Sequence, residues 1–314
     1  MSAVLHDFDD GIFAIDSGYI RQAFDAIHLI VEKGRVAIID TATQHSAPRV
    51  MHALTELGLS PEAVDYVVLT HIHLDHAGGA GRLMQLCPHA QLTVHPRGAP
   101  HMTDPSKLWT AVVAVYGKEM ADREYGPPVP IDPTRILETP EGCQIRLADR
   151  VIEFWDAPGH ARHHVFVVDH KTGAVFTGDT YGISYRELDT PAGPFAFVSS
   201  SPSQFDPPAH QASIRRVMNS DCPAVYLTHY SQLTAVRAVG EQLLRQVDDY
   251  AALAQRHGYR GPERAQAIQA DLRTHLFSAA RAHGVMASDG ELESIIGLDL
   301  RLNADGLVSW LDRL

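Results

Sequence analysis

The chain has 314 residues, of which 45% are hydrophobic and 20% are charged, and its formal net charge is −12. This composition is that of an ordinary folded protein, long enough for about two domains. The acidic balance argues against nucleic acid as the main partner, because phosphate contacts need clustered Lys and Arg. The three cysteines are widely spaced and form no Cys-x-x-Cys pair, which is typical of reduced structural thiols.

The N-terminus is acidic and lacks the apolar core of a signal peptide. No apolar run reaches the ~20 residues that a membrane span requires. We therefore expect a cytoplasmic protein that acts on a small-molecule substrate, without nucleic-acid or membrane partners. The pattern leaves a homodimer open.

In chain order, the first part of the sequence predicts strands joined by tight turns. Residues 26–40 predict a hairpin, and residues 46–58 predict a helix with a proline in its first turn. The run V-D-Y-V-V-L-T at 64–70 predicts a buried strand. A short helix over 79–86 and a strand over 91–95 follow.

Residues 96–142 are rich in proline around one helical stretch at 106–123, and they resemble an insertion or lid. Strands return at 144–156 and 164–179. Residues 181–208 predict a loop rich in proline, serine and aromatic side chains, which either line a pocket or pack the loop itself.

From about residue 232 the apolar spacing becomes helical, and a second helix begins at Pro262. Ser288 and Glu291 form a capping-box pattern for a third helix. The alternating leucines of 298–302 predict a strand before a last short helix.

Metal-capable side chains follow four of the predicted strands. They occur in T-H-I-H-L-D-H (70–76), D-A-P-G-H (156–160), F-T-G-D (176–179) and L-T-H-Y (227–230). Rigid strands fix the positions of side chains, while the loops beyond them carry the reactive groups. Metal-capable residues after four strands therefore indicate one site. Imidazole and carboxylate groups suit Zn, Fe or Mn, and the absence of a motif cysteine argues against a thiolate-rich structural zinc site.

Together these motifs resemble the metallo-β-lactamase superfamily, in its glyoxalase II, lactonase and thioesterase-like branch. The matching pieces lie within about residues 12–233. The resemblance implies an α/β fold, a four-layer αββα sandwich with the site along one edge of its two sheets. We predict a catalytic domain over 1–231, with an insertion at about 96–142, and a mainly helical C-terminal extension over 232–314.

The resemblance also implies a set of metal ligands. One metal would be held by His71, His73 and His160, and a second by Asp75, His76 and His229, with Asp179 bridging the two. Asp40 and His164 would support the ligands from behind. Asp179 stands where the best-known zinc β-lactamases have Cys or a residue that is not a ligand, which argues against antibiotic hydrolysis.

We therefore predict a dinuclear metal-dependent hydrolase that uses a metal-bridging hydroxide on an acyl substrate, which is a thioester, an ester or a lactone. The cofactors are two divalent ions, with zinc preferred over iron or manganese. Asp75 would orient the nucleophile, and Tyr181 is a candidate donor to the oxyanion. The alternatives are a mononuclear-iron oxidoreductase similar to persulfide dioxygenases, and a phosphodiesterase.

Overall fold

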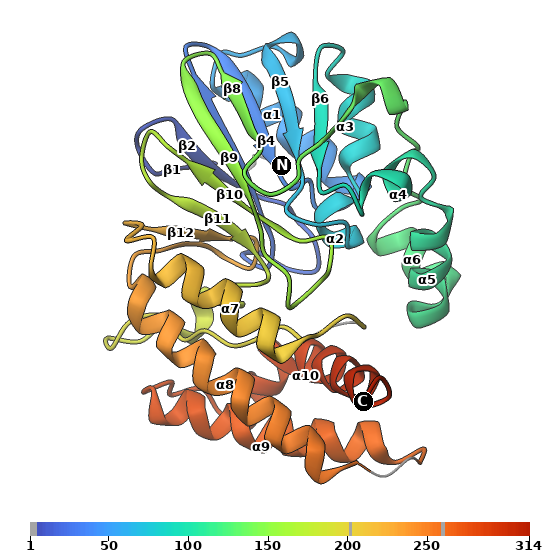
Figure 1. The fold of residues 1–314 in the computed structure, drawn as a ribbon, viewed down its shortest axis with the longest axis vertical. Coiled ribbons are helices and arrows are strands. Elements are labelled where there is room, and N and C mark those ends of the chain that lie inside the picture. The colour runs from blue at the N-terminus through green and yellow to red at the C-terminus, as the bar shows by residue number, and fades with distance from the viewer. Residues whose placement is uncertain (1–4, 201–202, 259–260) are drawn as a thin grey trace. The chain divides into compact units, whose positions relative to one another are not determined.

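The computed structural model describes residues 5–200, 203–258 and 261–314 (Figure 1). The first four residues of the predicted N-terminus and residues 201–202 of the predicted loop lie outside the described residues. The chain forms two compact units that alternate along the sequence, so the domain boundary after residue 231 stays a prediction. The first unit comprises Met1–Asp156, His163–Gly178 and Thr228–Ser231, and the second comprises Ala157–Arg162, Asp179–Leu227 and Gln232–Leu314.

The first unit is built on a seven-stranded sheet whose strands follow one another in sequence order. The first four strands pair antiparallel and the remaining pairs are parallel. The predicted hairpin is confirmed, with Glu32 opposite Arg35 beside its turn. The strands are β1 (Leu5–Asp7), β2 (Ile12–Asp16), β3 (Ala26–Glu32), β4 (Arg35–Ile39), β5 (Val64–Val68), β6 (Gln91–Val94) and β7 (Ile136–Glu138).

A second sheet in the first unit contains four antiparallel strands. They are β8 (Gln144–Leu147), β9 (Arg150–Asp156), β10 (Val165–Asp169) and β11 (Val175–Gly178). Two short strands, β12 (Val225–Leu227) and β13 (Ser231–Leu233), come later in the chain. The two sheets of the first unit pack on each other, as shown by the edge-on contact of His28 of β3 with Phe176 of β11, whose ring centroids are 5.4 Å apart.

Helices cover the outer face of the first sheet. α1 and α3 place apolar residues such as Val50 and Leu83 in one core with Val67 and Leu92 of the sheet. Removing such side chains from water stabilises the unit by about 25 cal/mol per Å² of apolar surface. The helices of this unit are α1 (Ala47–Glu56), α2 (Leu74–Ala77), α3 (Ala80–Leu86), α4 (Ala99–Thr103), α5 (Ser106–Tyr116) and α6 (Lys118–Glu124), with short 3₁₀ segments at Gln44–Ser46, Pro61–Ala63 and Pro133–Arg135.

The insertion differs from its prediction in two respects. The single helix expected over 106–123 is two helices, because Gly117 between them has φ of +79°, a conformation that favours glycine. The proline-rich end of the insertion also supplies β7, which pairs in parallel with β6. The insertion therefore contributes an edge strand as well as helices.

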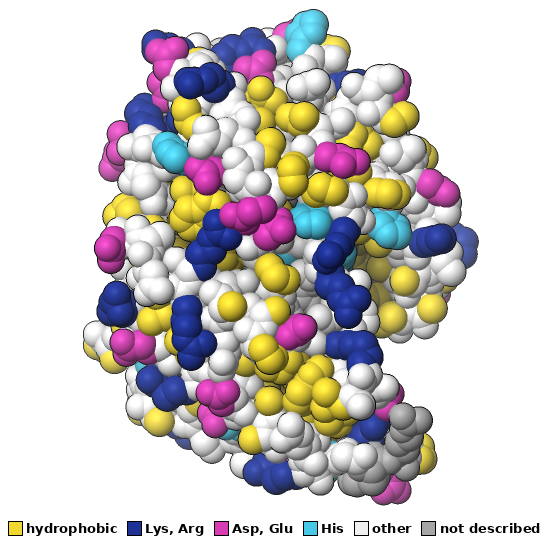
Figure 2. All heavy atoms as spheres, in the orientation of Figure 1, with side chains coloured by type: hydrophobic (Ala, Val, Ile, Leu, Met, Phe, Trp, Pro, Cys, Tyr) yellow, Lys and Arg dark blue, Asp and Glu magenta, His cyan; other side chains and the backbone are white. Residues whose placement is uncertain are grey.

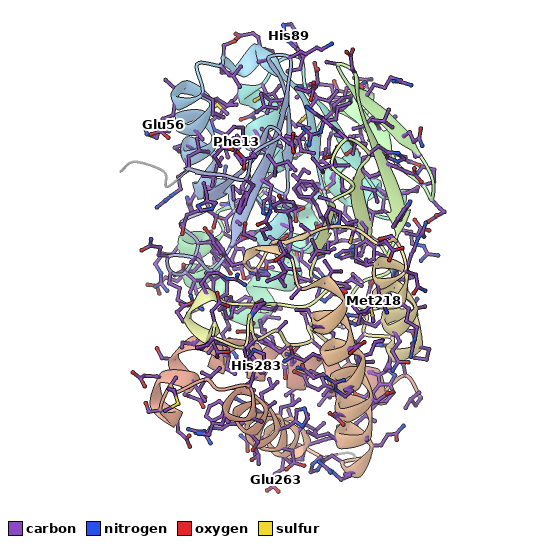
Figure 3. The ribbon with its side chains drawn as sticks, turned by 90° about the vertical axis from the view of Figure 1, so that its left-hand side faces the viewer. Phe13, Glu56, His89, Met218, Glu263 and His283 are labelled. Atoms are coloured by element: carbon purple, nitrogen blue, oxygen red, sulfur yellow. The ribbon has the colours of Figure 1, made fainter. Side chains whose placement is uncertain are left out.

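The second unit consists mainly of helices. They are α7 (Pro207–Met218), α8 (Val236–Arg256), α9 (Arg264–Ala282) and α10 (Asp289–Leu311), with a 3₁₀ segment at Arg186–Leu188. Figure 3 labels Met218 at the end of α7, and Glu263 and His283 at the two ends of α9. The capping box of Ser288 and Glu291 is confirmed at the start of α10.

The strand predicted at residues 298–302 is wrong, since these residues lie inside α10. Its buried residues include Leu292, Ile296, Leu300 and Leu307, at helical spacing. The alternation of the leucines was a coincidence within a helix whose apolar face continues on either side of them.

The fold class is confirmed as mixed α/β, with two multi-stranded sheets and C-terminal helices. None of the helices in the described ranges combines the length and the apolar character that crossing a membrane requires. Figure 2 shows acidic and basic side chains mixed over the face that it draws, although the net charge of the chain is −12.

Candidate metal centre

Two histidines lie just beyond β5, as the sequence predicted. The Nε2 atom of His71 and the Nδ1 atom of His73 are 2.9 Å apart. Thr70 Oγ1 gives its proton to Asp40 Oδ2, so it accepts from the Nδ1–H group of His71 at 3.2 Å. This bond leaves the lone pair of His71 on Nε2, where it faces His73.

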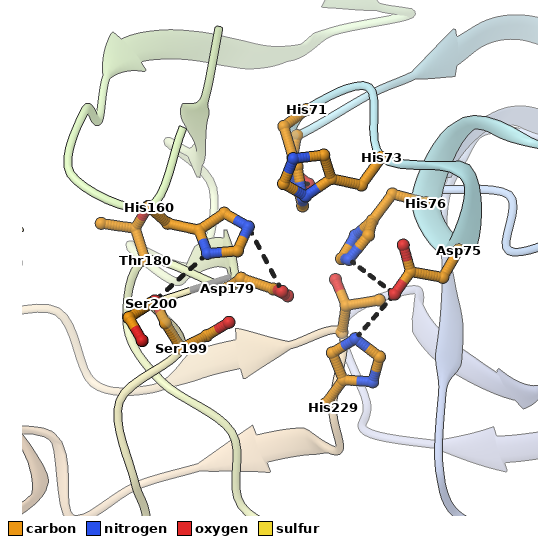
Figure 4. A network of polar contacts seen from close by, with 12 residues as sticks. His71, His73, Asp75, His76, His160, Asp179, Thr180, Ser199, Ser200 and His229 are labelled. Carbon is orange, nitrogen blue, oxygen red and sulfur yellow. Dashed lines mark hydrogen bonds and ion pairs between the residues drawn. The ribbon is translucent and has the colours of Figure 1, made fainter. Parts of the chain in front are cut away.

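Asp75, His76 and His229 form a second cluster within the first unit. Each offers one ligand atom, and these three atoms lie within 4.8 Å of one another. Asp75 Oδ2 is 3.9 Å from His76 Nε2 and 3.6 Å from His229 Nε2, contacts that Figure 4 marks with dashed lines. α2 carries Asp75 and His76, and its single turn presents both side chains to His229.

The Asp40 carboxylate organises this cluster from behind. Its Oδ2 atom accepts hydrogen bonds from His76 Nδ1 at 2.8 Å, Thr70 Oγ1 at 2.7 Å and Thr228 Oγ1 at 2.8 Å. Its Oδ1 atom accepts from the backbone N–H of Thr70 at 2.8 Å. A carboxylate that accepts from Nδ1 fixes the tautomer of His76, so the lone pair lies on Nε2. His229 is held in the same way, because its Nδ1–H group donates to the carbonyl oxygen of Phe24 at 2.9 Å.

His164 lies against the first pair of histidines. Its ring stacks on that of His71, with centroids 4.8 Å apart and an interplanar angle of 25°. His163, for which no site role was predicted, is also close, with its ring centroid 5.5 Å from that of His73. A Cβ atom at Gly178 would lie 2.6 Å from His164 Nε2, so this glycine makes room for His164.

In the second unit, His160 and Asp179 lie together, with Nε2 and Oδ2 3.6 Å apart (Figure 4). The Nδ1–H group of His160 donates to the carbonyl oxygen of Ser199 at 3.2 Å, which again leaves the lone pair on Nε2. His210 of α7 packs beside them and donates from Nε2 to the carbonyl of Thr180 at 2.7 Å. Burial, with a smaller contribution from His160, lowers the pKa of His210 to about 3, so this ring stays neutral.

The structure gives Tyr181 a different environment from the one predicted. Its ring is fully buried in the second unit, and its hydroxyl donates to the carbonyl oxygen of Val236 at 2.8 Å. Its role as an oxyanion donor stays a prediction and would require this bond to break. The five aromatic residues proposed as pocket lining are all fully buried, so they pack the loop: Tyr181, Tyr185, Phe195, Phe197 and Phe205.

Sequence reasoning missed several residues beside the second cluster. Thr70 and Thr228 each precede a ligand in the tripeptide L-T-H, and this repetition was the available signal. Tyr19 had no signal in the sequence, yet its hydroxyl donates to that of Tyr125 at 2.5 Å. Burial, Tyr125 and the charge of Asp75 raise the pKa of Tyr19, so its hydroxyl remains a donor.

The donor set fits a divalent metal. Imidazole nitrogens and carboxylate oxygens are ligands for Zn, Fe and Mn. Four of the histidines present an Nε2 lone pair fixed by a hydrogen bond at Nδ1, namely His71, His76, His160 and His229. The three free cysteines lie elsewhere in the chain, at Cys87, Cys143 and Cys222. The site chemistry is therefore that of a nitrogen and oxygen centre, as the sequence predicted.

A family model described as the metallo-beta-lactamase superfamily matches residues 26–229, which is more than half of the chain. The chain belongs to this superfamily. All seven predicted metal ligands lie in the matched range, and His229 is its last residue.

Curated relatives are similar over part of their length. A diflavin flavoprotein from Nostoc is 23% identical over 186 residues, which are 59% of this chain and 28% of that protein. A hydroxyacylglutathione hydrolase from Xanthomonas euvesicatoria is 30% identical over 168 residues, which are 53% of this chain and 48% of that protein. The chain thus spans less than half the length of either relative.

Among solved structures, a metallo-beta-lactamase family protein from Thermus thermophilus matches with a TM-score of 0.64 and 18% identity. The match covers 96% of this chain and 93% of that one. At this identity the likeness shows the fold alone.

Proposed function

We propose that the protein is a dinuclear metal-dependent hydrolase of acyl compounds, namely a thioester, an ester or a lactone. The observation that carries the proposal is the convergence of Asp75, His76 and His229, whose ligand atoms lie within 4.8 Å of one another. A carboxylate and two tautomer-fixed imidazoles make one metal position.

The remaining ligands are assigned by membership of the superfamily. His71, His73 and His160 are proposed for the other position, with Asp179 as the bridge. Asp179 directly follows Gly178, the last residue of β11, and His160 lies in a short segment between β9 and β10. Both residues thus lie just beyond the ends of strands, as the assignment of His160 and Asp179 as metal ligands requires.

Two divalent ions held by these residues would lower the pKa of a water molecule toward ~7 and polarise a substrate carbonyl. Asp75 is the partly exposed member of its cluster, so a carboxylate oxygen can accept a hydrogen bond from the attacking water and orient it. Asp40 keeps His76 in one tautomer through the reaction. The Tyr19 and Tyr125 hydroxyls stay protonated, since burial raises the pKa of both. The Tyr19 proton is donated to Tyr125, so this pair supports the Asp75 side without offering two donors to it.

The acyl class is supported by the name of the Xanthomonas relative, which denotes a hydrolase of an acylated glutathione. Asp179 in place of Cys argues against β-lactams, and the acidic net charge argues against polynucleotides. Zinc is the proposed metal, with iron or manganese as the alternatives.

The decisive measurement compares kcat/KM for an aryl-acyl thioester, a long-chain lactone and bis-p-nitrophenyl phosphate on one metal-replete preparation. We expect an acyl substrate to be preferred. A phosphodiester preference of more than about tenfold over both, or ~1.4 kcal/mol in transition-state binding, would assign a phosphodiesterase instead.

Metal analysis of protein purified without added metal tests the dinuclear centre. Two equivalents per chain agree with the proposal, whereas one iron with oxygen uptake on a persulfide would assign an oxidoreductase. Asp179→Ala should reduce bound metal well below two equivalents and nearly abolish turnover. Asp189→Ala is the matched control, because it removes a more exposed carboxylate of the same unit. It should change neither the bound metal nor the turnover.

A further inference from the structure

Asp25 carries a buried carboxyl group that the fold itself does not use. It directly precedes β3, and the residue is 1% exposed. Within the described part of the chain, neither of its carboxyl oxygens has a hydrogen-bond partner, although both are inaccessible. Buried polar groups are nearly always hydrogen-bonded, so an exception of this kind requires an explanation, such as a bound ion.

The backbone on both sides of Asp25 is tied to the segment that carries His229. The carbonyl oxygen of Phe24 accepts from His229 Nδ1 at 2.9 Å, and the backbone N–H of Ala26 donates to the carbonyl of Thr228 at 2.8 Å. The Phe24 ring also meets the His229 ring edge-on, with centroids 5.3 Å apart. Asp25 is therefore held next to a proposed metal ligand by contacts of both its neighbours.

The groups that act on Asp25 belong to the proposed metal position. Burial raises the pKa of the Asp25 carboxyl well above its usual range, the imidazoles of His229 and His76 oppose this, and the carboxylates of Asp75 and Asp40 add to it. Two imidazoles and two further carboxyl groups therefore lie within electrostatic range of Asp25. A bound divalent cation would supply the charge that balances such a cluster.

We infer that Asp25 is a further acidic residue of the metal centre, whose carboxylate stabilises the cation at the position formed by Asp75, His76 and His229. The inference rests on the proposed metal function and adds a residue to it. Asp25 is a positioning residue in this role, because it acts on the cation and on His229 without touching the substrate.

The test is Asp25→Asn, which removes the charge and keeps the shape of the side chain. One of the two zinc equivalents should bind ~10–100-fold more weakly, the range that supporting residues of metal sites commonly show. Competition with a chromophoric chelator measures this affinity without reference to turnover. The metal-free variant should unfold at the same temperature as the metal-free wild type or higher, and zinc should raise its Tm by less.

Asp16→Asn is the matched control, at the end of β2, where the loop that leads to Asp25 begins. Asp16 is 4% exposed, and its carboxylate accepts from the backbone N–H groups of Gly18 at 2.8 Å and Ala23 at 2.6 Å. This substitution should lower the Tm of the metal-free protein and leave zinc affinity unchanged. The two variants therefore separate a structural carboxylate from one that acts on the cation.

Wild-type affinity for both zinc equivalents in Asp25→Asn would overturn the inference and leave the proposed hydrolase standing. A metal-free Asp25→Asn protein that is destabilised like the control, with an unchanged zinc-induced rise in Tm, would overturn it too. A wild-type protein that binds no zinc, iron or manganese would instead overturn the proposed function, and the inference with it.

Discussion

Gly178 controls the space behind the first pair of histidines. Its φ is +46°, and a Cβ atom there would lie 2.6 Å from His164 Nε2 and 2.7 Å from Thr70 Oγ1. Thr70 donates to Asp40, so a displaced Thr70 disturbs the support of His76. A glycine at this position therefore leaves the space that His164 and Thr70 occupy beside the proposed metal ligands.

We expect Gly178→Ala to lower the free energy of unfolding by about 2–4 kcal/mol, from backbone strain and the two clashes together. It should also weaken zinc binding. Gly34→Ala is the control, because Gly34 has φ of +75° but nothing within 4 Å of an added Cβ. That variant should lose about 1–2 kcal/mol, with zinc affinity unchanged. If urea unfolding gives the same loss of unfolding free energy for Gly178→Ala and Gly34→Ala, backbone strain alone determines the effect at Gly178.

At the residue scale, the sequence was informative wherever a ligand follows a strand in a short motif. Asp75, His76 and His229 were predicted to share a metal, and the structure brings them together. Asp25 could not be predicted, because only packing shows that its carboxyl is buried without a partner. The contact of Tyr19 could not be predicted for a similar reason, since its hydrogen-bond partner Tyr125 lies 106 residues away in the sequence.

At the scale of elements, an ion pair connects the start of β9 to the end of β10. Arg150 donates from Nε to Asp169 Oδ1 at 2.7 Å and from Nη2 to Oδ2 at 2.6 Å, and both side chains are fully buried. Arg150 also donates from Nη1 to the carbonyl of Asp10 at 2.6 Å, in the turn before β2. One side chain therefore joins the two sheets of the first unit.

Arg150→Ala should lower the free energy of unfolding by about 3–5 kcal/mol, because it leaves the Asp169 carboxylate buried without its cation. The double variant Arg150→Met, Asp169→Leu removes both charges and should lose less than the single variant. Urea unfolding of the single and double variants measures both values. A double variant at least as unstable as Arg150→Ala would show that the guanidinium acts mainly through Asp10.

The same pair predicts a dependence of stability on pH. Burial raises the pKa of Asp169, but the hydrogen bonds from Arg150 and Thr172 and the charge of Arg150 outweigh it and hold that pKa below its ordinary value. A depressed folded-state pKa stabilises the protein above the unfolded pKa of ~3.9, and this contribution is lost as the pH falls further. Wild-type Tm should therefore fall below about pH 4 more steeply than that of the double variant.

Elements were predictable where one local signal dominated. The hairpin of β3 and β4 and the capping box of α10 follow from a few neighbouring residues. α10 was partly misread as a strand because its face includes buried polar residues, Asp299 and Asn303, which break the apolar helical pattern. Their partners are Tyr185 and Ser200, more than a hundred residues earlier, so no local window contains the explanation.

At the scale of the whole molecule, the second unit is held together by buried polar contacts between its loop and its helices. Ser200 N donates to Asn303 Oδ1 at 2.7 Å, and Gln246 Nε2 donates to the carbonyl of Ala196 at 2.9 Å. Around them the aromatic residues of the loop are fully buried. The loop and the C-terminal helices therefore depend on each other for folding.

Deleting residues 234–314 should give insoluble protein, because it exposes the aromatic residues of the loop. Asn303→Ala is a milder test and should cost about 1–3 kcal/mol, since it leaves buried groups without their partners. Solubility and urea unfolding measure the two effects. A soluble truncated chain that unfolds cooperatively would show that the loop folds without the helices.

The hydrogen bonds that Asp40 accepts from distant residues also affect when the site can form during synthesis of the chain. Thr228, which donates to Asp40, lies 188 residues further along the chain. At ~5–20 residues per second a ribosome takes roughly 10–40 s to cover that stretch. During this interval Asp40, and later Asp75 and His76, exist without Thr228 and His229, so the nascent chain lacks part of the proposed ligand set. Tight metal uptake is therefore expected after translation has passed His229, as a late step in maturation.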